Sequence, residues 1–290
     1  MREYQIVTDT NSDLPPSYIQ EHGLITVPQY YTVEDVIYEG AGGMEPSVFY
    51  QKMREGQKPQ SQAINPAVVE EEFRSVLESG KDILYISFAS TLSGSFNTAV
   101  MVARELKEEY GDAKILLVDS CNISLSEGLL VNKAVQMQKQ GKSLEENAEW
   151  LEKNKLHICV QFTVDDLHHL QRGGRVSKTT AVVGSILSIK PIMRLSGDSK
   201  LEAVGTVRGR KKSLLSLVDY MEERSKGFEP QNDLVGIVHG DCLEEAKWLA
   251  EQVKSRLGVP EVMICDVNPS IGVHSGPGAM GLMFFGSSRD

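Results

Sequence analysis

The chain has 290 residues, of which 41% are hydrophobic and 24% are charged, as is typical of a soluble globular protein. Its formal net charge of −10 at pH 7 argues against broad binding to nucleic acids and to anionic membranes, because both favour a basic surface. No apolar run reaches the roughly 18 residues of a membrane span, and the N-terminus lacks the apolar core of a signal peptide. The four cysteines form no CxxC pair, which indicates buried thiols in a reducing compartment and predicts a cytoplasmic location.

The first half of the chain alternates short apolar runs with amphipathic segments. Strands are expected at residues 4–7, 24–31, 83–88 and 114–119. Helices are expected at residues 15–21, 46–54, 66–79, 96–110, 124–139 and 143–154. Residues 32–43 are expected to be irregular, and residues 60–62 to form a polar loop that could be plain surface. This order predicts an α/β fold whose N-terminal domain, residues 1–157, is a three-layer structure with a mostly parallel sheet.

Several polar residues stand where they could cap these helices. Ser124 with Glu127, and Ser143 with Glu146, have the spacing of capping boxes. Asp13 could cap the helix at 15–21, or it could form part of a polar site wall. The sequence alone leaves that choice open.

The turn at residues 90–95 joins the buried strand 83–88 to the helix 96–110. A helix that begins at such a turn presents unpaired backbone N–H groups and the positive end of its dipole, and both favour a small anion. The alternative is that Ser90 or Ser93 only caps the helix. Sites in parallel sheets lie beyond the carboxyl ends of the strands, so the turns at 8–13 and 90–95 are expected at the same edge.

From residue 158 the pattern changes to antiparallel elements. Strands are expected at 158–164, 234–238, 262–267 and 281–285, with a hairpin formed by 191–195 and 201–207. Helices are expected from residue 165, over 208–224 and over 244–257, and residues 271–278 read as a glycine-rich turn. The C-terminal domain, residues 158–290, is therefore predicted to be α+β with antiparallel strands.

Five stretches, in this order along the whole chain, together resemble the DegV family. They are residues 7–15 (VTDTNSDLP), 92–95 (LSGS), 165–175 (DDLHHLQRGGR), 190–192 (KPI) and 274–279 (HSGPGA). The resemblance implies a bacterial two-domain protein that holds one long-chain fatty acid in a tunnel between its domains. It also implies that the protein presents the carboxylate to a separate fatty-acid kinase, which forms acyl phosphate. No cofactor or metal is implied, and the histidines show no metal-ligand spacing.

The resemblance also assigns roles to single residues. The family has a Pro-x-Thr-Ser-Gln-Pro loop whose threonine touches the carboxylate, and Ser61 stands in that threonine's position, although the next two residues depart from the pattern. Ser93, with Gly94 beside it, matches the family's Leu-Ser-Gly turn, and His274 matches the histidine of the C-terminal glycine-rich turn. Histidine could donate a hydrogen bond to the head group, with added charge if protonated.

The Arg-Gly-Gly-Arg stretch matches Arg172 to Arg175 and implies contact with the kinase at these two arginines. Salt bridges within the chain are the alternative for both side chains.

A second class of function is an acyl-ester hydrolase built on Ser93, His274 and Asp9. A nucleophile elbow requires Gly-x-Ser-x-Gly, and Thr91 and Ser95 stand in the glycine positions. A self-contained kinase would need a phosphate-binding loop, and the sequence has no Gly-x-x-x-x-Gly-Lys-Ser/Thr. The predicted carrier would therefore depend on a separate kinase.

Overall fold

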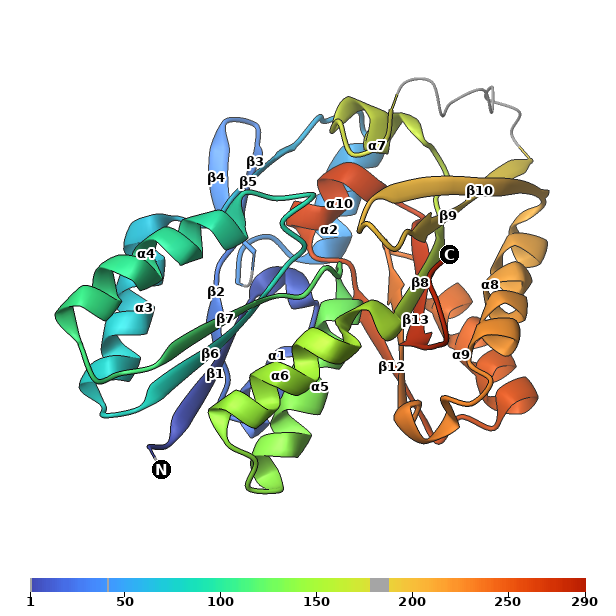
Figure 1. The fold of residues 1–290 in the computed structure, drawn as a ribbon. Helices are drawn as coiled ribbons and strands as arrows, with labels where there is room; N and C mark the ends of the chain where they lie inside the picture. The colour runs from blue at the N-terminus through green and yellow to red at the C-terminus, as the bar shows by residue number, and fades with distance from the viewer. Residues whose placement is uncertain (1, 41, 178–187) are drawn as a thin grey trace.

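A computed structural model describes residues 2–40, 42–177 and 188–290 and places their strands in three sheets (Figure 1). The first sheet has the order β2-β1-β6-β7 and is parallel throughout. Its strands are β1 (Tyr4–Asp9), β2 (Ile25–Val27), β6 (Asp82–Ser87) and β7 (Ile115–Asp119).

Successive side chains along the strands of this sheet point to opposite faces, and both faces are buried. Val7, Ile83 and Tyr85 pack with the helices α3 (Pro66–Glu78) and α4 (Ser95–Glu109). Ile6, Leu84 and Ile86 belong to the central core with the helices α5 (Leu125–Lys139) and α6 (Leu144–Asn154). The predicted three-layer α/β arrangement is confirmed.

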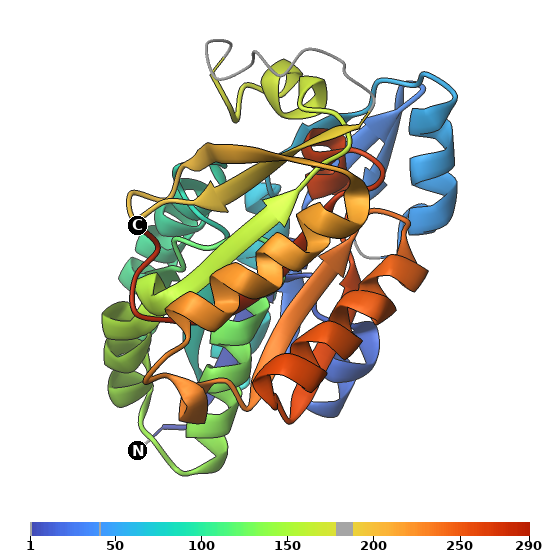
Figure 2. The same cartoon turned by 90° about the vertical axis from the view of Figure 1, so that its right-hand side faces the viewer.

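The second sheet is built by the other half of the chain and has the order β10-β9-β8-β13-β11-β12. Its strands are β8 (Ile158–Thr163), β9 (Ile189–Leu195), β10 (Leu201–Arg208), β11 (Leu234–His239), β12 (Glu261–Asp266) and β13 (Met280–Phe285). Only the β11–β12 pair is parallel, so the predicted antiparallel α+β character is confirmed. The helices α8 (Arg210–Arg224) and α9 (Leu243–Leu257) cover its outer face, as Figure 2 shows.

The inner face of the second sheet meets α5 and the first half of the chain. Val160 and Met283 from the sheet share one core with Leu129 and Leu130 of α5. The predicted boundary coincides with the start of β8, and the division into domains 1–157 and 158–290 stays a prediction. Within the residues described, no helix is both long and apolar enough to pass through a membrane.

The prediction of a single strand at residues 24–31 is wrong in detail, because the structure has two strands there. The segment is divided between β2 and β3 (Tyr30–Val33), which belong to different sheets. β3 pairs with β4 (Val36–Glu39) and β5 (Gln60–Gln62) in a small antiparallel sheet. The prediction missed β4 and β5 because both strands are largely exposed and are held by backbone pairing rather than by apolar burial.

The glycine-rich turn predicted at 271–278 is also wrong, because its first part is the helix α10 (Pro269–Ser275). Asn268 caps this helix by accepting a hydrogen bond from the backbone N–H of Ser270, and Pro269 is its first residue. Gly276, with φ +73°, then ends the helix in the left-handed region that favours glycine.

The capping predictions have mixed outcomes. The predicted box of Ser143 and Glu146 is present. The predicted box of Ser124 is absent, because the Ser124 hydroxyl donates to the Asp13 carboxylate. Glu127 instead accepts a hydrogen bond from Thr8 at 2.8 Å. Asp13 does not cap α1 (Pro16–Glu21), whose N-cap residue is Pro15 and which has no side-chain cap. The remaining helices are α2 (Pro46–Arg54) and α7 (His168–Arg172).

Candidate functional site

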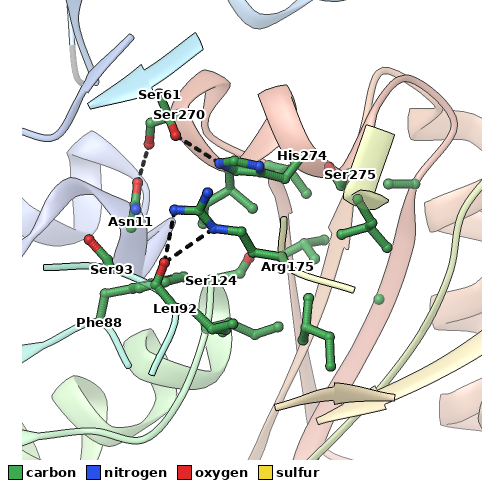
Figure 3. Close-up of a pocket in the computed structure, with 18 of the residues that line it drawn as sticks. Asn11, Ser61, Phe88, Leu92, Ser93, Ser124, Arg175, Ser270, His274 and Ser275 are labelled. Carbon is green, nitrogen blue, oxygen red and sulfur yellow. Dashed lines mark hydrogen bonds between the residues drawn. The ribbon is translucent and has the colours of Figure 1, made fainter. Parts of the chain in front are cut away.

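A cavity of about 990 Å³, its mouth included, lies between the two halves of the chain. Its wall includes the turns that follow β1 and β6, the start of α5, the strands β5, β8, β11 and β13, and the helices α7 and α10. Much of its lining is apolar, including Phe88, Leu92, Ile123, Val160, Phe162, Leu170, Val238, Val267, Ile271 and Met283. Polar side chains gather in one part of the wall (Figure 3). Such a cavity suits a ligand with a long apolar body and a polar head.

Ser61 and His274 form one polar pair of this wall. The Ser61 hydroxyl lies 2.7 Å from His274 Nε2, although 213 residues separate them in the sequence. β5 places Ser61 beside β3, and α10 brings His274 from the other half of the chain. Ser61, Ser93, Gly94 and His274 all line the cavity, while their binding roles stay predictions.

The His274 side chain is neutral at pH 7. Burial and, to a smaller extent, the positive charges of Arg175 and Arg172 lower its pKa to about 4. The Nδ1 atom of His274 is buried and has no hydrogen-bond partner among the described residues. In the protein without a ligand, the neutral imidazole is therefore the favoured form at neutral pH.

A glycine on α7's C-terminal side fixes the position of the His274 ring. A Cβ atom built on Gly173 would stand 2.0 Å from His274 Nδ1. A second histidine packs on a glycine in the same way: a Cβ atom built on Gly276, after α10, would stand 2.5 Å from the ring of His169 in α7. Each histidine thus packs on a glycine of the opposite segment, which locks α7 against α10.

Ser93 lies in the turn before α4 and belongs to a chain of hydroxyl and amide groups. Its hydroxyl is 2.9 Å from that of Ser95, which in turn donates to Gln29 Oε1 at 3.0 Å. Ser93 also accepts a weak hydrogen bond from the backbone N–H of Ser95 at 3.3 Å, so it is tied to the start of the helix as well as exposed to the cavity. The other candidate cap, Ser90, instead binds Asp119.

The two arginines of the Arg-Gly-Gly-Arg stretch take different positions. Arg172 is exposed and donates to His169 Nδ1 at 2.9 Å. Arg175 is half-buried in the cavity wall, where its Nη2 and Nε donate to the carbonyl oxygen of Leu92 at 3.0 and 3.3 Å. Arg172 is thus open to solvent and Arg175 lies in the cavity wall, and contact of either arginine with a partner protein stays a prediction.

Several polar residues of the cavity wall were missed as site residues by sequence reasoning, among them Asn11, Gln29, Ser124 and Ser270. Asn11 belongs to a polar cluster after a strand, and that signal could have identified it. Ser270 lies one helical turn before His274, but α10 was not predicted. Among the described residues, no group of three or more His, Cys, Asp or Glu side chains could hold a metal ion.

The hydrolase triad imagined from the sequence is not assembled by these contacts. His274 contacts Ser61 instead of Ser93. Asp9 accepts hydrogen bonds from the backbone N–H groups of Phe88 and Asn11, both at 3.0 Å.

Comparison with known proteins gives a consistent result over the whole chain. The model of the DegV protein family matches residues 3–287. A DegV domain-containing protein of Clostridium perfringens is 37% identical over 292 residues, covering 100% of both chains.

Solved structures show the same fold. A DegV family protein of Thermus thermophilus, described as binding fatty acid, is 28% identical with a TM-score of 0.83, covering 99% of this chain and 100% of that one. A stearic-acid-binding protein of Eubacterium ventriosum is 24% identical with a TM-score of 0.88, covering 99% and 98% of the two chains.

Proposed function

Because the chain belongs to the DegV family, we propose that it binds one long-chain fatty acid in the cavity and presents the carboxylate to a separate fatty-acid kinase for acyl-phosphate formation. The observation that carries this proposal is the cavity itself, which combines an extended apolar lining with a cluster of hydrogen-bonding groups at Ser61, Ser93 and His274. The protein would act in the cytoplasm, where ATP and the kinase are available.

The energetic roles of tail and head differ. Each buried methylene contributes about 0.8 kcal/mol, so a chain of about fourteen gives on the order of 11 kcal/mol before the entropic costs of binding. A hydrogen bond to a charged group contributes about 1.5–3 kcal/mol. The tail therefore supplies most of the affinity, and the hydroxyl groups of Ser61 and Ser93 supply orientation.

One cationic and one neutral group complete the head site. Arg175 brings a positive charge into the cavity wall, which favours an anionic head. Neutral His274 can donate from Nε2 to the Ser61 oxygen, and this leaves the Ser61 proton free for the carboxylate. Arg172, exposed beside the same helix pair, is the proposed point of contact with the kinase.

Mass spectrometry of the purified protein tests binding. We expect one fatty acid per chain in the native mass spectrum, lost on denaturation, and the organic extract identifies its length and unsaturation. If the protein carries no lipid and takes up no added palmitic acid after delipidation, the carrier proposal is wrong.

Presentation to the kinase requires a second assay. With ATP and the kinase, hydroxylamine should trap acyl phosphate as the hydroxamate. The Ser93→Ala variant should reduce this yield more than it reduces palmitic acid binding, because the head loses a donor while the tail stays buried. Equal yields from wild type and variant would count against the role of Ser93.

An acyl-ester hydrolase remains the second candidate, because the contact of Ser61 with His274 resembles a nucleophile and its base. Two features disfavour it. A histidine whose pKa is about 4 is a weak general base, and no described acidic group accepts a hydrogen bond from its Nδ1. Turnover of p-nitrophenyl palmitate that is abolished by Ser61→Ala would favour the hydrolase.

A further inference from the structure

Two of the side chains that the helix α10 presents to the cavity lie one turn apart, and each meets a partner from the first half of the chain. His274 meets Ser61, as described above. Ser270, four residues earlier, donates its hydroxyl proton to Asn11 Oδ1. All four side chains line the cavity, and Figure 3 shows the two pairs side by side. The second pair has no role in the function proposed so far.

Asn11 is held firmly in place. It is 6% exposed, and its backbone N–H donates to Asp9 Oδ1 at 3.0 Å. Ser270 is also buried, and its backbone N–H is fixed by Asn268 at 2.9 Å. The amide of Asn11 is therefore oriented by a neighbour that is itself anchored.

The Ser270 hydroxyl contacts the Oδ1 end of the Asn11 amide and also lies 3.0 Å from Asn268 Oδ1, so Oδ1 of Asn11 is directed toward α10 and Nδ2 away from it. The Nδ2 group of Asn11 has no hydrogen-bond acceptor within the described ranges, although Asn11 forms part of the cavity wall. Asn11 Nδ2 is not among the fully buried unpaired atoms, so it is open to the cavity, where an oxygen of a bound ligand could accept its hydrogen bond.

The position of Asn11 suits the same head group that Ser93 would bind. Ser95, which contacts Ser93, donates to the side chain of Gln29, and the backbone N–H of Gln29 donates to Thr10 beside Asn11. One hydrogen-bonded chain thus joins the two turns that follow β1 and β6. Asn11, Ser93 and Ser270 all line the same cavity (Figure 3).

We infer that Asn11 Nδ2 donates a hydrogen bond to the carboxylate of the bound fatty acid and that Ser270 is the positioning residue that turns the amide toward it. This inference rests on the proposed function and adds a head-group selectivity to it. With Nδ2 facing the cavity, the site favours an anionic or carbonyl-type oxygen. The opposite orientation would present an acceptor, which would repel a carboxylate.

Binding of two matched ligands to the delipidated full chain tests the inference. Palmitic acid and 1-hexadecanol share a sixteen-carbon chain but differ in head-group charge. Asn11→Ala should weaken palmitic acid about tenfold, because a donor to a charged group is lost, and 1-hexadecanol about threefold or less. Asn11→Asp should weaken palmitic acid further, because two carboxylates would face each other.

Two further variants keep the test decisive. Ser12→Ala changes the same turn at a buried serine that does not line this cavity, so both ligands should bind as in wild type. Ser270→Ala removes the hydroxyl that orients the amide and should selectively weaken palmitic acid, even if the Asn11 variants fail to fold.

The inference is overturned if the Asn11 or Ser270 variants leave palmitic acid affinity unchanged, or if both ligands weaken equally. A wild-type chain that binds neither ligand would instead refute the proposed function.

Discussion

Replacing Gly173 with alanine tests the packing that sets the head end of the cavity. The backbone at this position has φ −73°, so alanine meets no conformational strain. Its Cβ would, however, stand 2.0 Å from Nδ1 and 2.8 Å from Cε1 of His274. The three nearest atoms that this Cβ would meet all belong to the imidazole ring, so the substitution acts first on that ring.

The structure allows two responses, and both have a cost. If the ring stays, overpacking costs about 1–3 kcal/mol. If the ring rotates away into the cavity, it gives up the 2.7 Å hydrogen bond with Ser61, which is worth about 1 kcal/mol. We therefore expect Gly173→Ala to lower the free energy of unfolding by about 1–3 kcal/mol. We also expect it to weaken palmitic acid binding, because either response disturbs Ser61.

Urea unfolding of the delipidated protein and calorimetric titration with palmitic acid measure the two effects. Gly111→Ala is the matched control, because no atom lies within 4 Å of the position that a Cβ on Gly111 would occupy and its φ is not in the left-handed region. The control should change neither quantity appreciably. If Gly173→Ala matches the control in both measurements, the inferred lock between α7 and α10 is refuted.

Three other predictions concern groups buried between the two halves. Arg289→Ala should lower the free energy of unfolding, measured by urea titration, by about 3 kcal/mol or more. The variant removes the donors to four oxygen atoms, those of Ile158, Cys121, Asn122 and Lys155. A free energy of unfolding within about 1 kcal/mol of wild type would contradict this prediction. Burial raises the pKa of Asp13 to about 8, so folding takes up a proton and the free energy of unfolding should fall as pH rises from about 5 to 8. In Asp13→Asn the free energy of unfolding should depend less on pH. Equal pH slopes for wild type and variant, measured by urea unfolding at several pH values, would refute this. Because the pKa of His274 is lowered to about 4, the affinity for palmitic acid, measured by calorimetry as a function of pH, should show no inflection near pH 6.5. An inflection there that disappears in His274→Gln would show that His274 titrates near its ordinary pKa.

The sheets could be predicted where strands are buried on both faces. β6 and β7 are apolar runs with turn residues at their ends, and periodicity found them because burial drives both the composition and the structure. β5 could not be found in this way. Its three residues are polar, and only the neighbouring β3 makes them a strand. Sequence reasoning read Ser61 as a loop residue for that reason.

The candidate site was predicted as a set of residues but not as an arrangement. The resemblance indicated Ser61, Ser93 and His274, yet nothing local in the sequence pairs Ser61 with His274 across 213 positions. Ser124 is the opposite case. Its spacing with Glu127 matches a capping box, but the Ser124 hydroxyl binds the buried Asp13 carboxyl group instead, because a buried polar group without a partner would be more costly than an uncapped helix end.

In the proposed carrier, the tail of the fatty acid supplies the affinity and the head group is held more weakly, which bears on how the carboxylate could react. Arg175, the cation in the cavity wall, already donates to the carbonyl oxygens of Leu92 and Gly173, so it need not form a tight ion pair with the ligand. The remaining donors are neutral side chains such as Ser61, Ser93 and Asn11. A carboxylate held by neutral donors keeps oxygen lone pairs that can attack a phosphoryl group, whereas a tight ion pair would hold them back. In the proposed carrier the apolar lining would retain the chain meanwhile, since the methylenes would supply most of the affinity. Strong retention of the tail and modest restraint of the head are thus compatible in one cavity, and a protein that presents a fatty acid to another enzyme requires both.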